Sequence, residues 1–569
     1  MHIDGVPNRS SRPTYLLRES YRQGKKVRKR TLANLSALSD EQIDAIRAVL
    51  SGHSVRAVDE LWQTTRSRSH GAVQAVRVAM QRLGFESLIA SRASPERDRV
   101  CAMVAARVLA PHTKLATTRW WHTTTLAEEY GVVETDEMDL YAAMDWLLER
   151  QGQIQKKLSA RHLCEGALAL YDLSSSYFEG NCCPLAKIGY SRDGKRNTPQ
   201  VNYGLLTTRT GCPVAISVYE GNTADVSTLM PQVKQLREQF GLERLVLVGD
   251  RGMISHKAID SLRALEGLAW ITALKSSQIR ALVHGGELQL GLFDERNLFE
   301  FAHPDFPGER LMACRNADLG RLRAHKRQAL LEATEKELQK VQARIENGSL
   351  AGRDKIGVRV GKVLNKYKVG KHFALTIEES DFQFQRLEPQ IAAEAALDGI
   401  YVIRTSVAKK QMTSAEAVRS YKALAEVERA FRSMKTIDLH IRPIHHRLEG
   451  RVRAHILLCM LAYYVEWHMR EAWRELMFAA DEDQERKKHR DPVAAAERSE
   501  AALDKVATCK LKDGSPAHSF RTLLEELSTI VRNTCQPRLE QRTGSTFQMT
   551  TLPNPAQQRA MQLLQSITV

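Results

Sequence analysis

Ala167-Leu-Ala-Leu-Tyr-Asp172 and Leu245-Val-Leu-Val-Gly-Asp250 are two short apolar runs that each end in an aspartate. Continuous apolar runs of this length predict strands that are buried on both faces of a sheet. A carboxylate at the end of such a strand is held by a rigid sheet and is open to solvent, which suits a metal ligand. Taken singly, either aspartate is more simply explained as a turn residue that bonds its own backbone.

The segments around these runs predict more of the same sheet. Further strand-like runs cover residues 201–207, 214–219, 268–274 and 400–405, and helix starts at Asp225 and Ser255 lie between them. From residue 167 to 274 the order is strand, strand, strand, helix, strand, helix, strand. This order predicts a mixed α/β sheet with helices packed on it.

A third carboxylate lies on a predicted helix that begins at Ser414 and runs to about Lys435. At ~100° per residue, Tyr421, Leu424, Glu428 and Lys435 fall within a ~60° arc of that helix. A glutamate on the apolar side of a helix is costly unless it is paired or binds a metal. The alternative is a surface ion pair of Glu428 with Lys435 or Arg432.

Three carboxylates form a hard-oxygen ligand set that suits Mg²⁺ or Mn²⁺ rather than zinc. Two such ions ~3.5–4 Å apart assist phosphodiester displacement. The formal net charge of +16 favours a polyanionic partner. These observations together predict metal-dependent phosphoryl transfer on a nucleic acid.

Composition excludes several other classes. With 43% hydrophobic and 26% charged residues, the chain is neither collagen-like nor disordered throughout. The longest apolar run, Ile456–Val465, is too short for the ~20 residues of a membrane span, and the first residues carry no signal-peptide core. Nine cysteines without a Cys-x-x-Cys pair argue against a disulfide framework and a structural zinc site. We therefore expect a cytoplasmic protein without membrane contact.

Changes of pattern along the chain predict several domains. We expect a basic hairpin and helix that contact DNA (1–60), a helical DNA-binding region (61–160), a catalytic domain in two parts (161–275 and 398–478) around an insertion (276–397), and a linker with a C-terminal tail (479–569). The hairpin turns at Gln23-Gly24, and the basic residues expected to contact phosphates are Lys25, Lys26, Arg28, Lys29 and Arg30. Within the insertion, Leu331, Leu338 and Ile345 recur every seven residues. This spacing predicts either a short coiled-coil arm or a helix lying on its own domain.

The carboxylate segments resemble a known family, the DDE transposases of bacterial insertion sequences. More narrowly, they are similar to the subgroup with a Y-x2-R-x3-E-x6-K signature and a large β-rich insertion before the last acidic residue. Here the signature reads Tyr421, Leu424, Glu428 and Lys435, so the spacing matches and leucine replaces the arginine. The segments 169–178, 189–204, 220–225, 246–253 and 430–455 are also similar to this family.

The resemblance implies an RNase H-like catalytic domain in which Asp172, Asp250 and Glu428 bind two Mg²⁺ or Mn²⁺ ions. It implies nicking at the terminal inverted repeats, transfer of the freed 3′-OH groups to target DNA in cut-and-paste transposition, and a homodimer in a synaptic complex on the nucleoid. Tyr421, Lys435 and Arg432 would contact DNA near the metals. The arginine contact of the family is not carried over to Leu424.

Two other functions are compatible with the same residues. One is a catalytically silent DNA-binding protein derived from a transposase, and the other is a Mg²⁺-dependent structure-specific nuclease. Of the acidic residues near the motifs, we interpret Asp225 as a helix cap and Asp193 as a loop charge.

Overall fold

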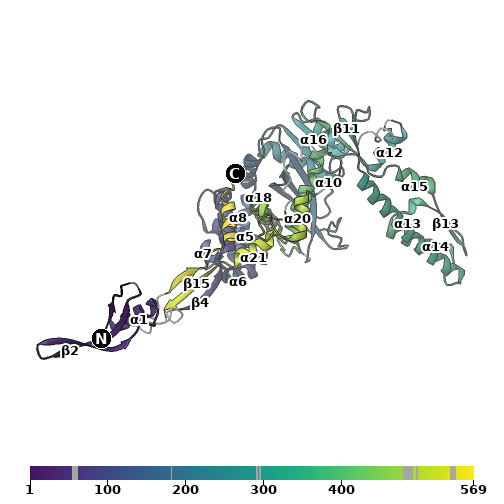
Figure 1. Ribbon diagram of the computed structural model, residues 1–569. Helices are drawn as coiled ribbons and strands as arrows, with labels where there is room; N and C mark the ends of the chain where they lie inside the picture. Colours follow the sequence, from purple (N-terminus) through teal and green to yellow (C-terminus); the bar gives the residue numbers. More distant parts are fainter. Residues whose placement is uncertain are drawn as a thin grey trace. The chain divides into compact units, whose positions relative to one another are not determined.

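A computed structural model describes residues 1–569 except 10, 54–61, 181, 196, 287, 290–292, 294–296, 479–490, 495–497 and 538–545. The described chain divides into two compact units (Figure 1). Unit 1 holds residues 1–69 and 530–552, and unit 2 holds residues 70–529 and 553–569. Most of the charged linker expected at Asp481–Glu500 lies outside the described residues.

Unit 1 contains the predicted basic hairpin. Strands β1 (His2–Val6), β2 (Thr14–Gln23) and β3 (Lys26–Asn34) form an antiparallel sheet with β2 in the centre. The turn between β2 and β3 requires a positive φ, and Gly24 supplies it with φ +61°. Helix α1 (Asp40–Leu50) begins at a capping box formed by Ser39 and Gln42, as their spacing predicts.

The rest of unit 1 joins the two ends of the chain. Strand β4 (Trp62–Ser69) pairs antiparallel with β15 (Val531–Pro537), which also pairs with β16 (Phe547–Thr550). These strands were not among the predicted elements, since β4 is mainly polar and carries no apolar alternation. Residues 530–552 are therefore part of the N-terminal unit rather than of a simple tail.

Unit 2 is built on an eight-stranded sheet with the order β10-β11-β14-β9-β8-β5-β6-β7. The predicted strands are confirmed: β5 (Leu168–Tyr177), β6 (Gln200–Thr208), β7 (Pro213–Glu220), β8 (Leu245–Val248), β9 (Leu268–Ala273) and β14 (Ile400–Thr405). Strands β5, β8 and β9 are mutually parallel, whereas β6, β7 and β14 join antiparallel. Helices α10 (Asp225–Lys234) and α11 (His256–Arg263) fill the intervals between strands, and Ser255 caps α11 as predicted.

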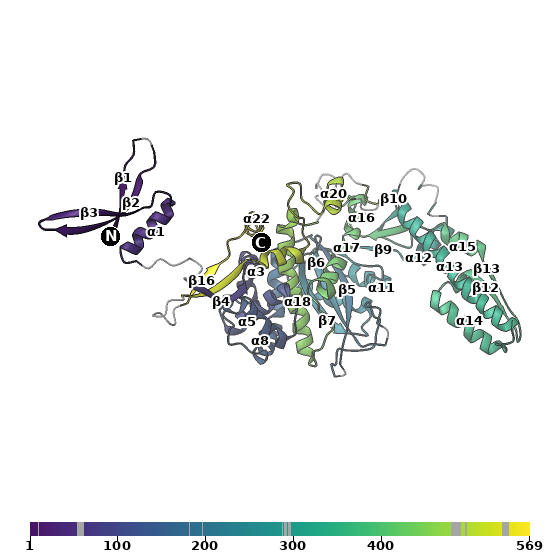
Figure 2. The ribbon, with the colours of Figure 1, turned by 60° about the horizontal axis from the view of Figure 1, so that its bottom comes forward.

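A layer of helices precedes the sheet in the sequence. Its members are α3 (Gly71–Arg82), α4 (Phe85–Ile89), α5 (Pro95–Leu109), α6 (Lys114–Trp120), α7 (Leu126–Glu129), α8 (Glu137–Glu149) and α9 (Gln151–His162). The long apolar helix α18 (Glu449–Ala472) contacts α3, α5 and α8 on one side and β7 on the other (Figure 2). The separate helical region predicted at 61–160 is therefore wrong, because these helices bury their apolar faces in a core shared with α18.

The insertion is mainly helical, which corrects the expectation of a β-rich segment. Strands β10 (Leu298–Phe301) and β11 (Arg310–Arg315) extend the main sheet past β14, with α12 (Ser276–His284) against them. Beyond them, α13 (Ala317–Glu346) and α14 (Arg353–Tyr367) lie side by side (Figure 1). A β-hairpin of β12 (Phe373–Ile377) and β13 (Phe382–Arg386) and helix α15 (Glu388–Ala395) complete this arm.

The arm has an apolar core of its own. Leu331 and Leu338 of the heptad pattern are buried in it, together with Val341 of α13 and Val360 of α14, and Ile345 packs at its edge. The heptad leucines thus mark the face of α13 that meets α14, so the expectation of a helix lying on its own domain is wrong.

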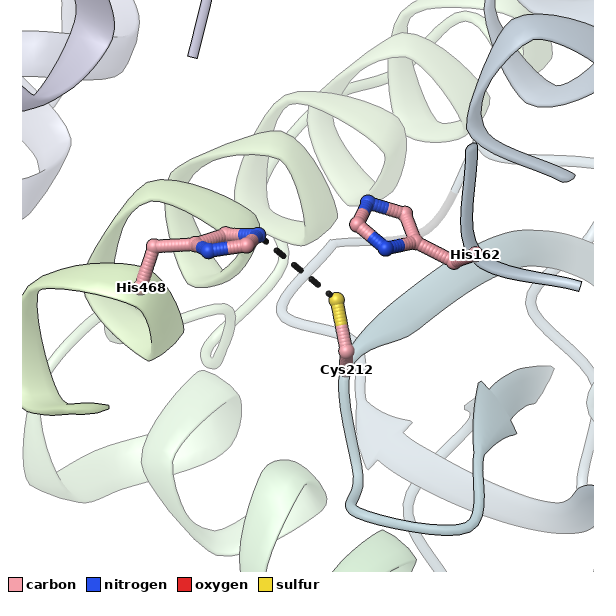
Figure 3. A group of neighbouring side chains, drawn as sticks. All are labelled: His162, Cys212 and His468. Atoms are coloured by element: carbon pink, nitrogen blue, oxygen red, sulfur yellow. Dashed lines mark hydrogen bonds between the residues drawn. The ribbon is translucent and has the colours of Figure 1, made fainter. Parts of the chain in front are cut away.

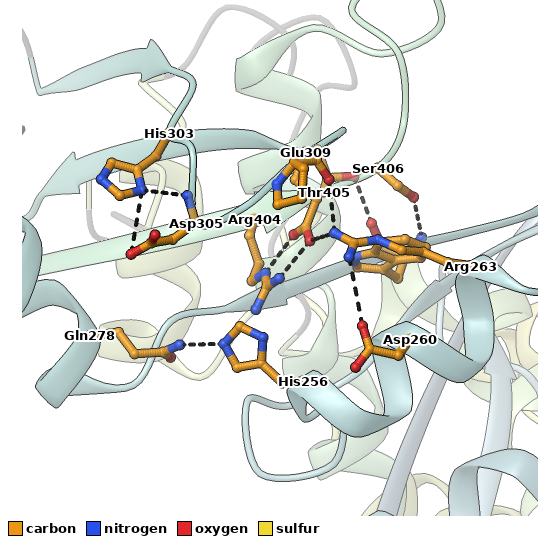
Figure 4. Close-up of polar contacts among 12 residues, drawn as sticks. His256, Asp260, Arg263, Gln278, His303, Asp305, Glu309, Arg404, Thr405 and Ser406 are labelled. Atoms are coloured by element: carbon orange, nitrogen blue, oxygen red, sulfur yellow. Dashed lines mark hydrogen bonds and ion pairs between the residues drawn. The ribbon is translucent and has the colours of Figure 1, made fainter.

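A buried ion cluster links β14 to the added strands (Figure 4). The Glu309 carboxylate is fully buried and accepts two hydrogen bonds of 2.5 Å from Arg404 of β14. Arg263 of α11 donates a third bond of 2.6 Å to it. A buried carboxylate with two guanidinium partners fixes the register between these elements, because losing either partner leaves charge unpaired in the core.

The C-terminal elements return to unit 2. Helices α20 (Glu500–Thr508), α21 (Phe520–Ser528) and α22 (Pro555–Leu564) follow, and α21 and α22 both contact α3. Among the described helices, none combines the length and the hydropathy that a bilayer-crossing segment needs.

Candidate active site

The pairing of β5 with β8 brings the two predicted aspartates to the same level of the sheet. Leu168 lies opposite Val246 and Leu170 lies opposite Val248, an offset of 78 residues (246 − 168). Asp172 and Asp250 are separated by the same 78 residues (250 − 172), and each lies two residues beyond the last of these pairs. Because side chains alternate along a strand and neighbouring strands are ~4.8 Å apart, both carboxylates leave the sheet on the same face.

Asp172 lies in the interior of β5, since this strand continues to Tyr177. Its Oδ1 accepts a hydrogen bond of 2.8 Å from the Leu173 amide. Burial raises the pKa of Asp172 to about 7; the Leu173 bond and the Arg192 guanidinium lower this pKa, and the charges of Asp250 and Glu428 raise it further. The site therefore concentrates negative charge that a cation would neutralise.

Asp250 lies just after β8 and is exposed. Its backbone carbonyl accepts hydrogen bonds from the amides of Met253 and Ile254, both 3.0 Å. These bonds form the turn that the simpler interpretation expected. The turn and the site are compatible, because the carbonyl makes these bonds and leaves the carboxylate on the side of Asp172.

Glu428 lies on α17 (Leu424–Arg432), which packs across β5 and β6. The single helix expected from Ser414 to about Lys435 is wrong: α16 (Ser414–Lys422) ends before α17, and a π-helical turn follows at Ser433–Ile437. The common arc of four residues is lost at these breaks. Glu428 is exposed rather than buried, so the argument from the cost of burying it does not hold.

The electrostatics nevertheless bring the three carboxylates together. Asp250 and Glu428 both act on the ionisation of Asp172. Burial raises the pKa of Tyr421 at the end of α16, and the charges of Asp250, Asp172 and Glu428 add to this rise. Tyr421 therefore lies beside all three carboxylates.

The donor set fits hard divalent ions. Carboxylate oxygens are the ligands that Mg²⁺ and Mn²⁺ prefer. Within the described residues, the three side chains are not among those whose ligand atoms all lie within 4.8 Å of one another. A pair of ions does not demand this closeness, because two ions ~4 Å apart with ligands at ~2.1 Å allow the outer carboxylates to stand up to ~8 Å apart.

Lys435 occupies a different environment from the one predicted for a DNA contact. Its ammonium is buried and lies 2.9 Å from Oδ1 of Asp193, which also pairs with Arg442. The Asp193 side chain is only 1% exposed and accepts a 3.1 Å bond from the Tyr177 amide at the end of β5. Asp193 is therefore a buried anchor for two cations, and its interpretation as a loop charge is wrong.

Arg192 is a further residue near the site that the sequence analysis did not single out. Its guanidinium donates bonds of 2.6 and 2.7 Å to the two carboxylate oxygens of Asp225. Asp225 is thus an ion-pair partner in the first turn of α10 and not the predicted cap, since the N-cap position belongs to Ala224. The segment that carries both Arg192 and Asp193 resembled the transposase family, and this was the available signal.

The remaining predicted DNA contacts are exposed. Arg432 is exposed at the end of α17. On β3 in unit 1, Lys29 pairs with Asp4 at 2.9 Å and Arg30 pairs with Glu19 at 3.1 Å. Lys25, Lys26 and Arg28 make no ion pair with the described residues, and their charges remain available to an anionic partner.

Two family models match the chain. The transposase DDE domain matches residues 185–465, and the N-terminal domain of IS1634 family transposases matches residues 5–65. The first match spans Asp250 and Glu428, and the second spans the basic hairpin. No curated protein matches the sequence.

Solved transposase structures show distant similarity. The cryo-EM structure of a piggyBac transposase synaptic complex with hairpin DNA is 9% identical, with a TM-score of 0.32 over 80% of this chain and 77% of that chain. A Mos1 transposase paired-end complex with the left transposon end is 11% identical, with a TM-score of 0.14 over 32% of this chain and 59% of that chain. At these TM-scores the assignment rests on the family models alone. This chain belongs to the DDE transposases of insertion sequences.

Proposed function

We propose that this transposase binds the terminal inverted repeats of its element, nicks the DNA there, and joins the freed 3′-OH groups to target DNA in cut-and-paste transposition. The observation that carries the proposal is the shared 78-residue offset, which sets Asp172 and Asp250 side by side on the face that the Glu428 helix covers. Acidic residues that gather from three distant segments are expected for a metal-dependent nuclease site.

We propose further that the sheet is RNase H-like. The support is the order β7-β6-β5-β8-β9, in which an antiparallel meander of three strands is followed by two parallel strands on the other side of β5. In this arrangement the first strand is central, and the carboxylate it carries is covered by helices. The added strands β14, β11 and β10 leave that part of the sheet undisturbed.

Asp172, Asp250 and Glu428 would hold two Mg²⁺ or Mn²⁺ ions. When bound, these ions supply Lewis acidity to the attacking and leaving oxygens of the phosphodiester. The protein's own part is to hold the reacting strand: the Tyr421 ring lies beside the carboxylates, and the exposed Arg432 faces outward from the same helix as Glu428. The phosphate contact predicted for Lys435 requires its pair with Asp193 to open.

The partner we propose is double-stranded DNA, first the element ends and then the target. Exposed hairpin cations add sequence-independent affinity for phosphates. We propose a homodimer as the synaptic species, because two ends must be held together for joint transfer. The site of action would be the nucleoid in the bacterial cytoplasm.

The test is Mg²⁺-dependent nicking of a plasmid that carries the element ends. Asp250→Asn should lower nicking by more than about 100-fold, because a metal ligand is lost, while affinity for end DNA stays near the parental value. Asp260→Asn is the matched control: Asp260 is exposed on α11 and pairs only with Arg263, at 3.7 Å. Near-parental nicking by Asp250→Asn contradicts the carboxylate assignment.

The same assay separates the other two functions. A nuclease would nick without joining ends to target DNA. A catalytically silent protein would bind the ends and yield neither product at any Mg²⁺ or Mn²⁺ concentration.

A further inference from the structure

A second group of potential metal ligands lies away from the three carboxylates. His162 at the end of α9, Cys212 in the turn between β6 and β7, and His468 on α18 turn their side chains toward one another (Figure 3). One ligand atom from each lies within 4.8 Å of the other two, and no other trio of this kind occurs in the described part of the chain. The Cys212 sulfur is 3.9 Å from Nε2 of His468.

The group is buried and its histidines are neutral. Cys212 is 1% exposed and His468 is 8% exposed. Burial lowers the pKa of His162 to about 4 and that of His468 to about 3, so both rings keep a lone pair at neutral pH. Cys212 is a free thiol. Neutral imidazole and a thiol that can lose its proton are the donors that zinc takes.

The hydrogen bonds also suit metal ligation. Nε2 of His162 lies 2.9 Å from the Tyr464 hydroxyl, which leaves Nδ1 of this ring for an ion. Histidine ligands commonly bond a second group through their other nitrogen, which fixes the ring. Tyr464 lies one turn before His468 on α18, so the same helix supplies a ligand and the group that orients another.

Nearby charges neither exclude nor demand a cation. The Arg161 guanidinium acts on both histidines and disfavours added positive charge. Glu471 acts on Cys212 and favours it. The choice of ion therefore depends on the ligand types rather than on a net field.

We propose that Cys212, His162 and His468 form a zinc site, with water as the fourth ligand. A thiolate with two imidazoles is too soft a set for Mg²⁺ and suits zinc. Bond lengths of ~2.3 Å to sulfur and ~2.0–2.1 Å to nitrogen place tetrahedral ligands ~3.4–3.6 Å apart, so the trio needs only a modest contraction. Zinc here would tie the helical layer, through α9 and α18, to the β6–β7 turn of the catalytic sheet.

The ligand spacing explains why the sequence argued against zinc. Cys212 is 50 residues from His162 (212 − 162) and 256 residues from His468. No local Cys-x-x-Cys or His-x-His pattern marks such a site, because its members meet only when helix α18 packs against the edge of the sheet.

The test uses the full chain purified from cells supplied with zinc. Elemental analysis should find one zinc per chain, and Co²⁺ added to the metal-free protein should give a thiolate-to-cobalt charge-transfer band. Cys212→Ser should abolish both signals, and His468→Gln should weaken zinc affinity by at least about tenfold. Asp250→Asn should keep the zinc, which separates this site from the proposed catalytic ions.

Cys459→Ser is the matched control. The Cys459 sulfur also lies 3.9 Å from a histidine nitrogen, Nε2 of His455, but no described third ligand completes a trio there. This variant should retain one zinc per chain. If Cys212→Ser does not fold, His162→Gln replaces it, because His162 is only partly buried.

Two results overturn the proposal. One is a folded parental protein that takes up neither zinc nor cobalt at this ratio and whose Cys212 is alkylated at the same rate with and without zinc. The other is zinc content that the Cys212, His162 and His468 variants leave unchanged.

Discussion

Asp172 is the residue whose ionisation the fold alters in the direction that matters for the site. Its pKa of about 7 lies above the usual carboxyl value of 3.8, chiefly through burial. Between these two values the folded protein binds a proton that the unfolded chain does not bind. The stability that Asp172 contributes is therefore full below about pH 4 and is lost as pH rises toward 7.

Asp172→Asn should consequently flatten the pH dependence of stability in the metal-free protein. We expect the apparent melting temperature of the parental protein to fall more between pH 5.5 and pH 8 than that of the variant, by the equivalent of ~1 kcal/mol or more. Thermal unfolding in the presence of a chelator measures this. Parallel profiles would mean that Asp172 is already ionised at pH 5.5.

Lys435 and Asp193 illustrate at the same scale how a motif residue can have an unexpected neighbour. The Tyr421-to-Lys435 spacing identified the family segment, yet the ammonium lies against a carboxylate from the loop after β5. This loop, the π-helical turn and Arg442 are joined through one buried side chain. The signature lysine therefore connects the Glu428 helix to the strand that carries Asp172.

At the scale of the element, the β2–β3 hairpin separates free from paired cations. Lys25→Ala/Lys26→Ala/Arg28→Ala should weaken DNA affinity and lower the slope of log K against log salt by about 2–3, because each lost phosphate contact removes ~0.9. Titration of a labelled duplex at several salt concentrations measures this slope.

The comparison variant is Lys29→Ala/Arg30→Ala on the same strand. Asp4 and Glu19 already pair with these two residues, so the slope should change less than for the triple variant. An unchanged slope in the triple variant would remove the hairpin from the DNA interface.

The junction of β14 with β10 and β11 depends on a buried ion cluster. Arg404→Met should destabilise unit 2 by about 3 kcal/mol, because it leaves the Glu309 carboxylate with one guanidinium in the core. The urea midpoint of unfolding reports the loss.

Arg263→Met is the control for this junction. The Arg263 side chain is 35% exposed, so its bond to Glu309 is partly screened and its removal should cost less than half as much. Equal losses would indicate that the two arginines are interchangeable.

At the scale of the whole molecule, the proposed synapsis requires two copies of the chain on two DNA ends. We expect a complex of two chains and two duplexes when the duplex carries the element end, and no such complex with unrelated DNA of equal length. Sedimentation analysis measures the stoichiometry, and Asp250→Asn should assemble like the parental protein. One chain per end at saturation would contradict the dimer.

The chain also closes on itself at this scale. Residues 531–537 return as β15 to pair with β4, and α22 then re-enters unit 2, where the Ala560 carbonyl accepts a 2.9 Å bond from the Trp473 indole. Each unit therefore contains residues from both ends of the sequence.

The sequence by itself determined the strands of the central sheet and the three carboxylates. Buried parallel strands need uninterrupted apolar residues, so β8 and β14 were predicted to the residue and β5 was recognised from its apolar half. The hairpin followed from its turn glycine, and Glu428 followed from its spacing to neighbouring signature residues. These features are local, and local patterns carry them.

Only the tertiary structure decided which surfaces meet. The helices before residue 163 are amphipathic, and nothing local says that α18 covers them. The polar strand β4 pairs with a segment more than 460 residues away. The buried pairs Lys435–Asp193 and Glu309–Arg404 and the trio Cys212, His162 and His468 also join distant segments. Such contacts form because folding brings charges and ligands together where water is excluded, and that proximity leaves no periodic trace in the sequence.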